Sequence, residues 1–334
     1  MNRQFMRAFR MLLLCATVAS CARVAPTTIG VQTNEEGRVR RLAELELSVV
    51  KITSSAYYRT WYYPRPSSFR LPAATAPPPA EQKLTSNSVA GTGVVLLQNQ
   101  REMVVLTCNH VLDFADTIRH YYLDENKRPT NHLRALSVRY RQDVFIFHRS
   151  GEWTVGELIA NDRENDIALL KTSRSEQHLA EAPLPCPFGD AGSLKLGQEV
   201  YVLGFPKGFF AVTRGLVSPS RGKGRFMLDI AFNRGYSGGV VVRLDGAKRA
   251  MEYVGMATSA AYDSQYLLVP AAETVPPASE SDVPYVGDVF VEELKLINYG
   301  ITFVVTSNVV GDFLRTHEER LQRMGFPLTS LFRG

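Results

Sequence analysis

Short apolar segments separated by polar turns make up most of the chain from residue 91 onward. Runs such as Val94–Leu97, Met103–Thr107 and Ile167–Leu170 are bounded by Gly, Asn or Asp residues. Short apolar runs between such turn residues are typical of β-strands. Seven more runs have this form: Leu136–Arg141, Val144–His148, Glu199–Leu203, Gly215–Ser218, Val240–Arg243, Tyr253–Ala257 and Gly300–Val305. The pattern predicts an all-β barrel or sandwich.

A few segments depart from this pattern. Residues 38–47 and 308–323 space their apolar side chains as amphipathic helices do, the second closing the chain. Residues 53–88 and 262–290 are rich in proline, and we expect two long loops there. The first loop holds an aromatic cluster that either packs on its own domain or forms a surface for a partner.

The amino terminus has the features of an export signal. Arg3, Arg7 and Arg10 precede an apolar run from Met11 to Ala19, which is about half as long as a membrane-spanning helix needs to be. A basic start with a short apolar run predicts a secretory signal peptide over residues 1–20.

The sequence Val18-Ala19-Ser20-Cys21 resembles the lipobox of bacterial lipoproteins. The resemblance implies cleavage before Cys21 and acylation of its thiol, with residues 21–45 as a tether and short helix. Two or more acyl chains give stable membrane anchoring. We therefore expect an exported protein of the cell envelope, lipid-anchored at the outer membrane or the periplasmic face. The alternative is a plain signal peptide without a lipid.

Composition narrows the remaining function classes. The 334 residues carry 38 Lys+Arg and 33 Asp+Glu, and loss of the three signal-peptide arginines lowers the net charge from +5 to 35 − 33 = +2. With no basic stripe or nucleic-acid motif, we expect no nucleic-acid partner. The four cysteines show no CxxC spacing and there is no HExxH motif, so we expect no metal and no cofactor. The cell envelope permits a disulfide between Cys108 and Cys186, but we favour two separate thiols, because Cys108 has the character of a small buried residue.

Three short motifs carry residues suited to nucleophilic catalysis. Ser237 lies in Gly235-Tyr236-Ser237-Gly238-Gly239, where glycines permit a tight turn beside a nucleophile. His110 follows a β run and is suited to act as a general base at neutral pH. Asp166 precedes the apolar run Ile167–Leu170 and could hold an imidazole in one tautomer. Each motif alone is of low specificity, but their order and β-rich setting point to one site.

Taken together, these motifs resemble the trypsin-like serine proteases, and in particular the bacterial HtrA/Do-like branch. Further matches extend from about residue 89 to 315, and include the segments Gly91–Val95, Leu106–Val111, Asn165–Lys171, Gly197–Val200, Leu203–Pro206, Val212–Ser218, Asp229–Ser237 and Tyr299–Val305. The resemblance implies two six-stranded antiparallel β-barrels with a C-terminal helix, the first over residues 46–178 and the second over 179–334.

The resemblance also implies the role of each residue. His110 takes the proton of Ser237, Asp166 orients His110, and the backbone N–H groups of Gly235 and Ser237 form the oxyanion hole. Ala231, six residues before Ser237, corresponds to the base of the primary substrate pocket. A small apolar residue there implies cleavage after small or medium apolar residues.

Some features depart from that family. Arg234, Tyr236 and Val240 replace the residues usual around the nucleophile, and only about thirty residues follow the last strand, too few for the PDZ domain of HtrA relatives. We therefore expect a serine endopeptidase without a PDZ domain that acts on protein or peptide substrates. The alternative is a non-catalytic or latent protease-fold module that binds a partner through its long loops. The sequence leaves a homo-oligomer open.

Overall fold

The computed structural model describes residues 29–66, 79–124, 128–174, 181–218, 224–245, 250–270 and 289–332. The expected signal peptide and Cys21 lie outside these residues. The described residues belong to two units that divide between Arg40 and Arg41. Within the described residues, every helix is too short or too polar to cross a membrane.

Helix α2 (Ile29–Glu46) starts nine residues earlier than the helix expected at residue 38 and ends one residue before the expected end. Its last turn enters the second unit, where Leu45 is fully buried. The hydroxyl of Ser48 donates to the carbonyl of Leu45 at 2.7 Å and ends the helix immediately before the first strand.

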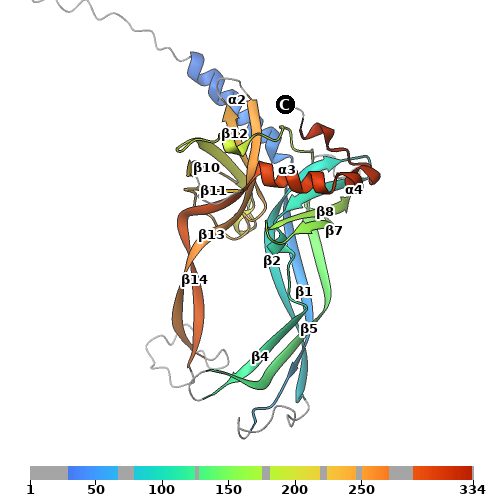
Figure 1. Cartoon of the computed structure of the whole chain (residues 1–334), viewed down its shortest axis with the longest axis vertical. Coiled ribbons are helices and arrows are strands. Elements are labelled where there is room, and N and C mark those ends of the chain that lie inside the picture. The colour runs from blue at the N-terminus through green and yellow to red at the C-terminus, as the bar shows by residue number, and fades with distance from the viewer. Residues whose placement is uncertain are drawn as a thin grey trace, which may run out of the picture. The chain divides into compact units, whose positions relative to one another are not determined.

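The first sheet contains eight strands in the order β4-β5-β1-β2-β3-β8-β7, with β6 paired to β5 (Figure 1). The strands are β1 (Val49–Tyr62), β2 (Glu81–Gln98), β3 (Glu102–Thr107), β4 (Thr117–Leu123), β5 (Pro129–Phe147), β6 (Trp153–Val155), β7 (Glu157–Asp162) and β8 (Ile167–Ser173). All the pairs are antiparallel. This sheet is open, because its path runs from β4 to β7 without closing, whereas a closed six-stranded barrel was expected for this half of the protein.

The second sheet is the expected closed six-stranded barrel, in the order β10-β11-β14-β13-β12-β9. Its strands are β9 (Glu199–Gly204), β10 (Ala211–Ser218), β11 (Arg225–Leu228), β12 (Gly239–Asp245), β13 (Ala250–Pro270) and β14 (Val289–Thr306). One buried apolar cluster joins the two sheets, because it includes Ile52 and Leu106 of the first together with Leu203, Val240 and Tyr253 of the second. The predicted all-β, two-sheet architecture is confirmed.

The prediction of two long loops, over residues 53–88 and 262–290, was wrong at both ends of each range, where the structure has paired strands. Residues 53–62 and 81–88 belong to β1 and β2, which pair from Val49↔Val94 out to Tyr62↔Glu81. Likewise β13 and β14 stay paired out to Pro270↔Val289. Proline content suggested loops, but hydrogen bonding between facing strands lets β13 and β14 extend beyond their barrel as a two-stranded arm (Figure 1). The outer parts of β1 and β2 extend together with β5, which stays paired with β1 out to Tyr62↔Ala135. We call these extensions the β1–β2 arm and the β13–β14 arm.

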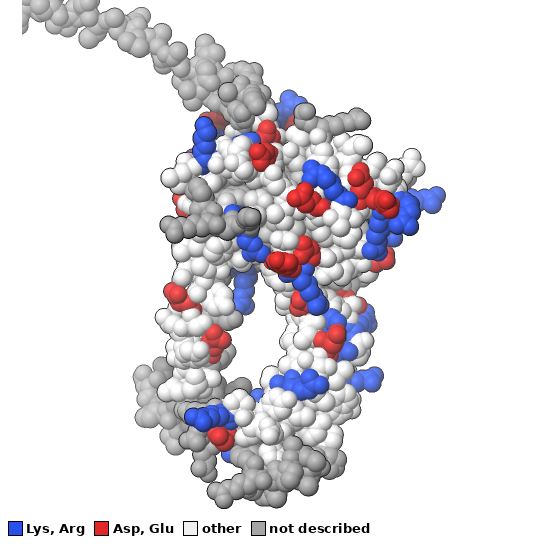
Figure 2. All heavy atoms as spheres, viewed as in Figure 1, with Lys and Arg blue, Asp and Glu red and all other residues white. Residues whose placement is uncertain are grey.

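The predicted single closing helix over residues 308–323 is two helices, α3 (Ser307–Thr316) and α4 (Glu318–Arg323), separated at His317. Thr306 caps α3 by accepting a hydrogen bond from the backbone of Val309. On the face drawn in Figure 2, basic and acidic side chains are interspersed.

Candidate active site

His110 lies in a single turn of 3-10 helix, Asn109–Val111, directly after β3. Its side chain is 45% exposed, so the ring is open to a ligand from solvent. A hydrogen bond from a nearby strand fixes this turn: the side-chain amide of Asn161 on β7 donates to the side-chain oxygen of Asn109 at 2.8 Å. The predicted base is therefore exposed, while the turn that carries it is fixed through its neighbour Asn109.

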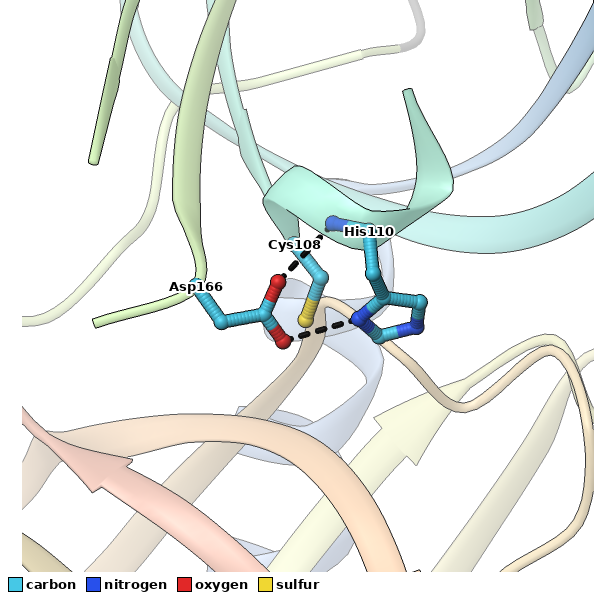
Figure 3. A group of neighbouring side chains, drawn as sticks. All are labelled: Cys108, His110 and Asp166. Carbon is cyan, nitrogen blue, oxygen red and sulfur yellow. Dashed lines mark hydrogen bonds and ion pairs between the residues drawn. The ribbon is translucent and has the colours of Figure 1, made fainter. Parts of the chain in front are cut away.

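Asp166 ends the tight turn between β7 and β8 and has a φ of +60°. Asp is one of the few residues with a side chain that adopt this left-handed conformation. Its carboxylate accepts two hydrogen bonds from one residue, from the backbone N–H and from Nδ1 of His110, each at 2.8 Å (Figure 3). These bonds fix the ring and its tautomer, leaving Nε2 of His110 free to accept a proton.

Ser237 comes from the second sheet, in the turn immediately before β12, and is 8% exposed. Its Oγ lies 2.9 Å from Nε2 of His110 and 3.2 Å from the carbonyl oxygen of Thr258 on β13. The structure thus brings the three predicted residues Ser237, His110 and Asp166 into one hydrogen-bonded chain. The carbonyl of Thr258 offers the hydroxyl a second acceptor.

The turn before Ser237 requires glycine at position 235. Gly235 has a φ of +105°, and a β-carbon there would lie 2.2 Å from the carbonyl oxygen of Phe205. Within the described part of the chain, the backbone N–H groups of Gly235 and Ser237 donate to no protein acceptor. The two predicted oxyanion donors are therefore available to a ligand.

Cys108 lies next to this site. Its Sγ, a ring nitrogen of His110 and a carboxylate oxygen of Asp166 lie within 4.8 Å of one another. Burial, and next the neighbouring Asp166, raise the pKa of the Cys108 thiol well above its ordinary value. A metal ion needs the thiolate, so this donor set favours a neutral thiol packed against the carboxylate. Cys108 and Cys186 are both free, which confirms the prediction of two separate thiols.

Ala231 is exposed between two buried residues, Ile230 and Phe232. A pocket of about 750 Å³ borders Asn109 beside the catalytic turn, but Ala231 does not line it. The role of Ala231 in substrate choice stays a prediction.

The sequence alone did not single out Asn161, Thr258 or Thr92. Asn161 binds the side chain of Asn109, the carbonyl of Thr258 accepts from Ser237, and the hydroxyl of Thr92 donates to the carbonyl of Gly235. The only signal was the position of Thr92 within Gly91-Thr92-Gly93, where glycines mark close approach of another backbone.

The chain is similar in sequence to known serine proteases. Residues 91–251 match the family model of the trypsin-like peptidase domain. The chain is 31% identical over 179 residues to a probable periplasmic serine endoprotease, DegP-like, from Marinomonas sp. (strain MWYL1), which covers 51% of this chain and 30% of that protein. It is 29% identical over 179 residues to a probable periplasmic serine protease, do/HhoA-like, from Haemophilus influenzae, with the same coverage of 51% and 30%. The chain therefore aligns with less than a third of either relative.

Among solved structures, the chain is similar to an HtrA-type protease determined with a decapeptide. That similarity has a TM-score of 0.46 at 18% identity and covers 84% of this chain and 66% of the other.

Proposed function

We propose that the chain is a serine endopeptidase, a proposal supported by the match of residues 91–251 to the model of the trypsin-like peptidase domain and by the similarity to DegP-like endoproteases. The observation that carries the proposal is the chain of hydrogen bonds from Ser237 Oγ through His110 to the carboxylate of Asp166, at 2.9 and 2.8 Å. Removing the serine proton through this chain makes the hydroxyl a nucleophile.

The proposed reaction proceeds through an acyl-enzyme. Ser237 Oγ attacks the peptide carbonyl carbon while His110 Nε2 takes the hydroxyl proton. The N–H groups of Gly235 and Ser237 donate to the resulting oxyanion. Collapse of the tetrahedral intermediate breaks the C–N bond, and His110 returns the proton to the leaving amine. Water then attacks the acyl-enzyme by the same route and frees Ser237.

Labelling with a serine-directed fluorophosphonate tests this proposal. We expect the folded chain to be labelled and Ser237→Ala to remain unlabelled, with cleavage of unfolded casein lost in parallel. Labelling that appears only after a peptide is added would identify a latent protease. A folded chain that is never labelled would contradict the proposal and favour a protease-fold binding module.

For substrate choice, we propose that Ala231 directs cleavage toward small or medium apolar residues. A peptide library tests this, and a cleavage profile dominated by Lys or Arg would contradict it.

We further propose that the β13–β14 arm contacts protein substrates. Tyr262, Tyr266 and Leu268 lie on one face of β13 and are 52%, 71% and 70% exposed. Tyr266→Ser with Leu268→Ser should leave cleavage of a short peptide unchanged and slow cleavage of casein. Leu196→Ser, which alters an equally exposed leucine in the turn before β9, is the matched control. Equal casein cleavage in all three chains would contradict this role.

For localisation, we propose an exported protein anchored at the cell envelope by acylation of Cys21. The lipobox-like sequence and the periplasmic names of the relatives support this. The mass of the amino-terminal peptide should show the acyl groups, and Cys21→Ala should move the protein out of the membrane fraction. An unmodified amino terminus would contradict the proposal.

A further inference from the structure

Thr92 is a buried polar residue at the junction of the two sheets. It lies in β2, directly ahead of an apolar run from Val94 to Leu97, and is 0% exposed. Valine has the same β-branched shape and brings no polar group that must be hydrogen-bonded. A hydroxyl buried in an apolar sheet is unfavourable unless it is hydrogen-bonded. The partners of this hydroxyl therefore indicate its role.

The hydroxyl of Thr92 both donates and accepts. It donates to the carbonyl oxygen of Gly235 at 2.6 Å and accepts from the backbone N–H of Phe205 at 2.9 Å. The backbone of Thr92 continues the contact, because its N–H donates to the carbonyl of Ser237 at 2.8 Å. Its own carbonyl accepts from the hydroxyl of Thr107, at the end of the strand that leads to His110, also at 2.8 Å.

The direction of the proposed oxyanion donors depends on how the neighbouring carbonyls are held. The C=O and N–H of one planar peptide group point in opposite directions, so holding a carbonyl also sets the N–H of the next residue. The N–H of Lys207 holds the carbonyl of Arg234 at 2.7 Å and thereby sets the N–H of Gly235. The N–H of Gly239 holds the carbonyl of Tyr236 at 2.7 Å and sets the N–H of Ser237.

Between these two peptide groups lies the peptide group of Gly235 and Tyr236, and the side chain that holds its carbonyl is Thr92. The same hydroxyl also binds Phe205, two residues before Lys207. It thus ties together the loop that carries the donors and the loop that orients one of them.

We propose that Thr92 is a positioning residue for catalysis: its hydroxyl holds residues 234–237 in the conformation in which the N–H groups of Gly235 and Ser237 can both bind the oxyanion. This inference rests on the proposed peptidase function. It requires the hydroxyl group, and not merely a side chain of this volume.

Thr92→Val, Thr92→Ser and Thr172→Val in the full chain test the proposal. Thr172 is the matched control, since it is 3% exposed in β8 and its hydroxyl also donates to a backbone carbonyl, that of Val155 at 2.9 Å. Loss of an oxyanion donor lowers kcat by roughly 10²–10³-fold, so we expect about a 10- to 100-fold lower kcat for Thr92→Val. KM should change by no more than about twofold, because the donors act mainly in the transition state.

Affinity for a peptidyl boronic acid, which forms a tetrahedral adduct with the serine, should fall in parallel with kcat/KM. Thr92→Ser keeps the hydroxyl and should restore both values. Thr172→Val should lower the urea midpoint as Thr92→Val does while leaving kcat near that of the parent chain.

Equal kcat values for Thr92→Val and Thr172→Val would overturn the proposal, as would an equally impaired Thr92→Ser. If Thr92→Val does not fold, Thr92→Ala removes the same hydroxyl without placing a methyl group against the carbonyl. If neither folds, the hydroxyl is structural and the proposal fails. An inactive parent chain that fluorophosphonate does not label would refute the peptidase function itself, which is a separate outcome.

Discussion

A β-carbon on Gly238 would lie 2.0 Å from the carbonyl oxygen of Thr92. The residue after the proposed nucleophile thus lies directly against the backbone of the first sheet. Gly238 also has a φ of +89°, a conformation that residues with side chains rarely adopt. Close approach and backbone conformation therefore both require glycine there.

Gly238→Ala is expected to destabilise the fold strongly. The left-handed conformation alone costs an alanine about 1 kcal/mol, and overpacking against a backbone that cannot move adds about 1–3 kcal/mol or more. Gly197→Ala is the matched control, because Gly197 has a φ of +75° with nothing within 4 Å of the added carbon. Urea unfolding should show a clearly larger loss for Gly238→Ala. Equal losses would mean that the contact with Thr92 contributes nothing.

Asp166→Asn should abolish most of the activity while preserving the fold. The carboxylate accepts from both the backbone N–H and Nδ1 of His110. An amide has only one acceptor oxygen, so the imidazole would lose its fixed tautomer, and kcat should fall by about 10³- to 10⁴-fold.

Asp162→Asn is the control for this change. Asp162 lies at the start of the same turn, and one oxygen accepts from the N–H groups of Glu164 and Asn165, a role that asparagine can also take. Only the bond of the other oxygen with the side-chain amide of Asn165 would be lost. The kcat of this variant should stay close to that of the parent chain. Similar losses for the two variants would show that the turn as a whole, and not the carboxylate of Asp166, supports the reaction.

Glu181 is expected to make stability depend on acid pH. Its side chain is 1% exposed and lies 3.6 Å from Nδ1 of His148. Burial alone would raise the pKa of Glu181, but the neighbouring His148 and the hydrogen bond from the N–H of Arg149 outweigh it and lower the pKa below its ordinary value of 4.5. Because the pKa is lower in the folded state, the carboxylate stabilises the fold above pH 4.5, and this contribution is lost as the pH falls further.

Glu181→Gln should therefore be less stable than the parent chain at pH 7, by about 1–3 kcal/mol. The difference should shrink as the pH falls from about 5 to 3. Urea unfolding at several pH values measures it. A difference that stays constant over this range would show that Glu181 is not ionised in the folded protein.

The two buried thiols should be unreactive in the folded protein. Burial raises the pKa of Cys186 to about 12 and that of Cys108 well above its ordinary value. The thiolate is the reactive form. The chain without residues 1–21 should thus resist iodoacetamide at pH 8 and take up two carbamidomethyl groups once unfolded in urea. No uptake after unfolding without a reductant would instead indicate a disulfide.

The predicted strands and the three chemical motifs were accessible from the sequence because each depends on a local pattern. Met103–Thr107 and Ile167–Leu170 are short, largely apolar runs beside turn residues, as is typical of buried strands, and both form strands. The arms were missed for the opposite reason. Residues such as Ser86 and Tyr57 show no local alternation that predicts a strand, and become strands by pairing with each other across the hairpin.

By itself, the sequence determined the β-rich class and the candidates His110, Asp166 and Ser237, since short-range pattern and side-chain chemistry are sufficient for these. Only the tertiary structure decided that Ser237 from one sheet lies 2.9 Å from His110 of the other, and that Thr92 holds the loop between Gly235 and Ser237. The physical reason is that such contacts join residues up to 143 positions apart, where register and packing, and not the neighbours in the chain, set the distance.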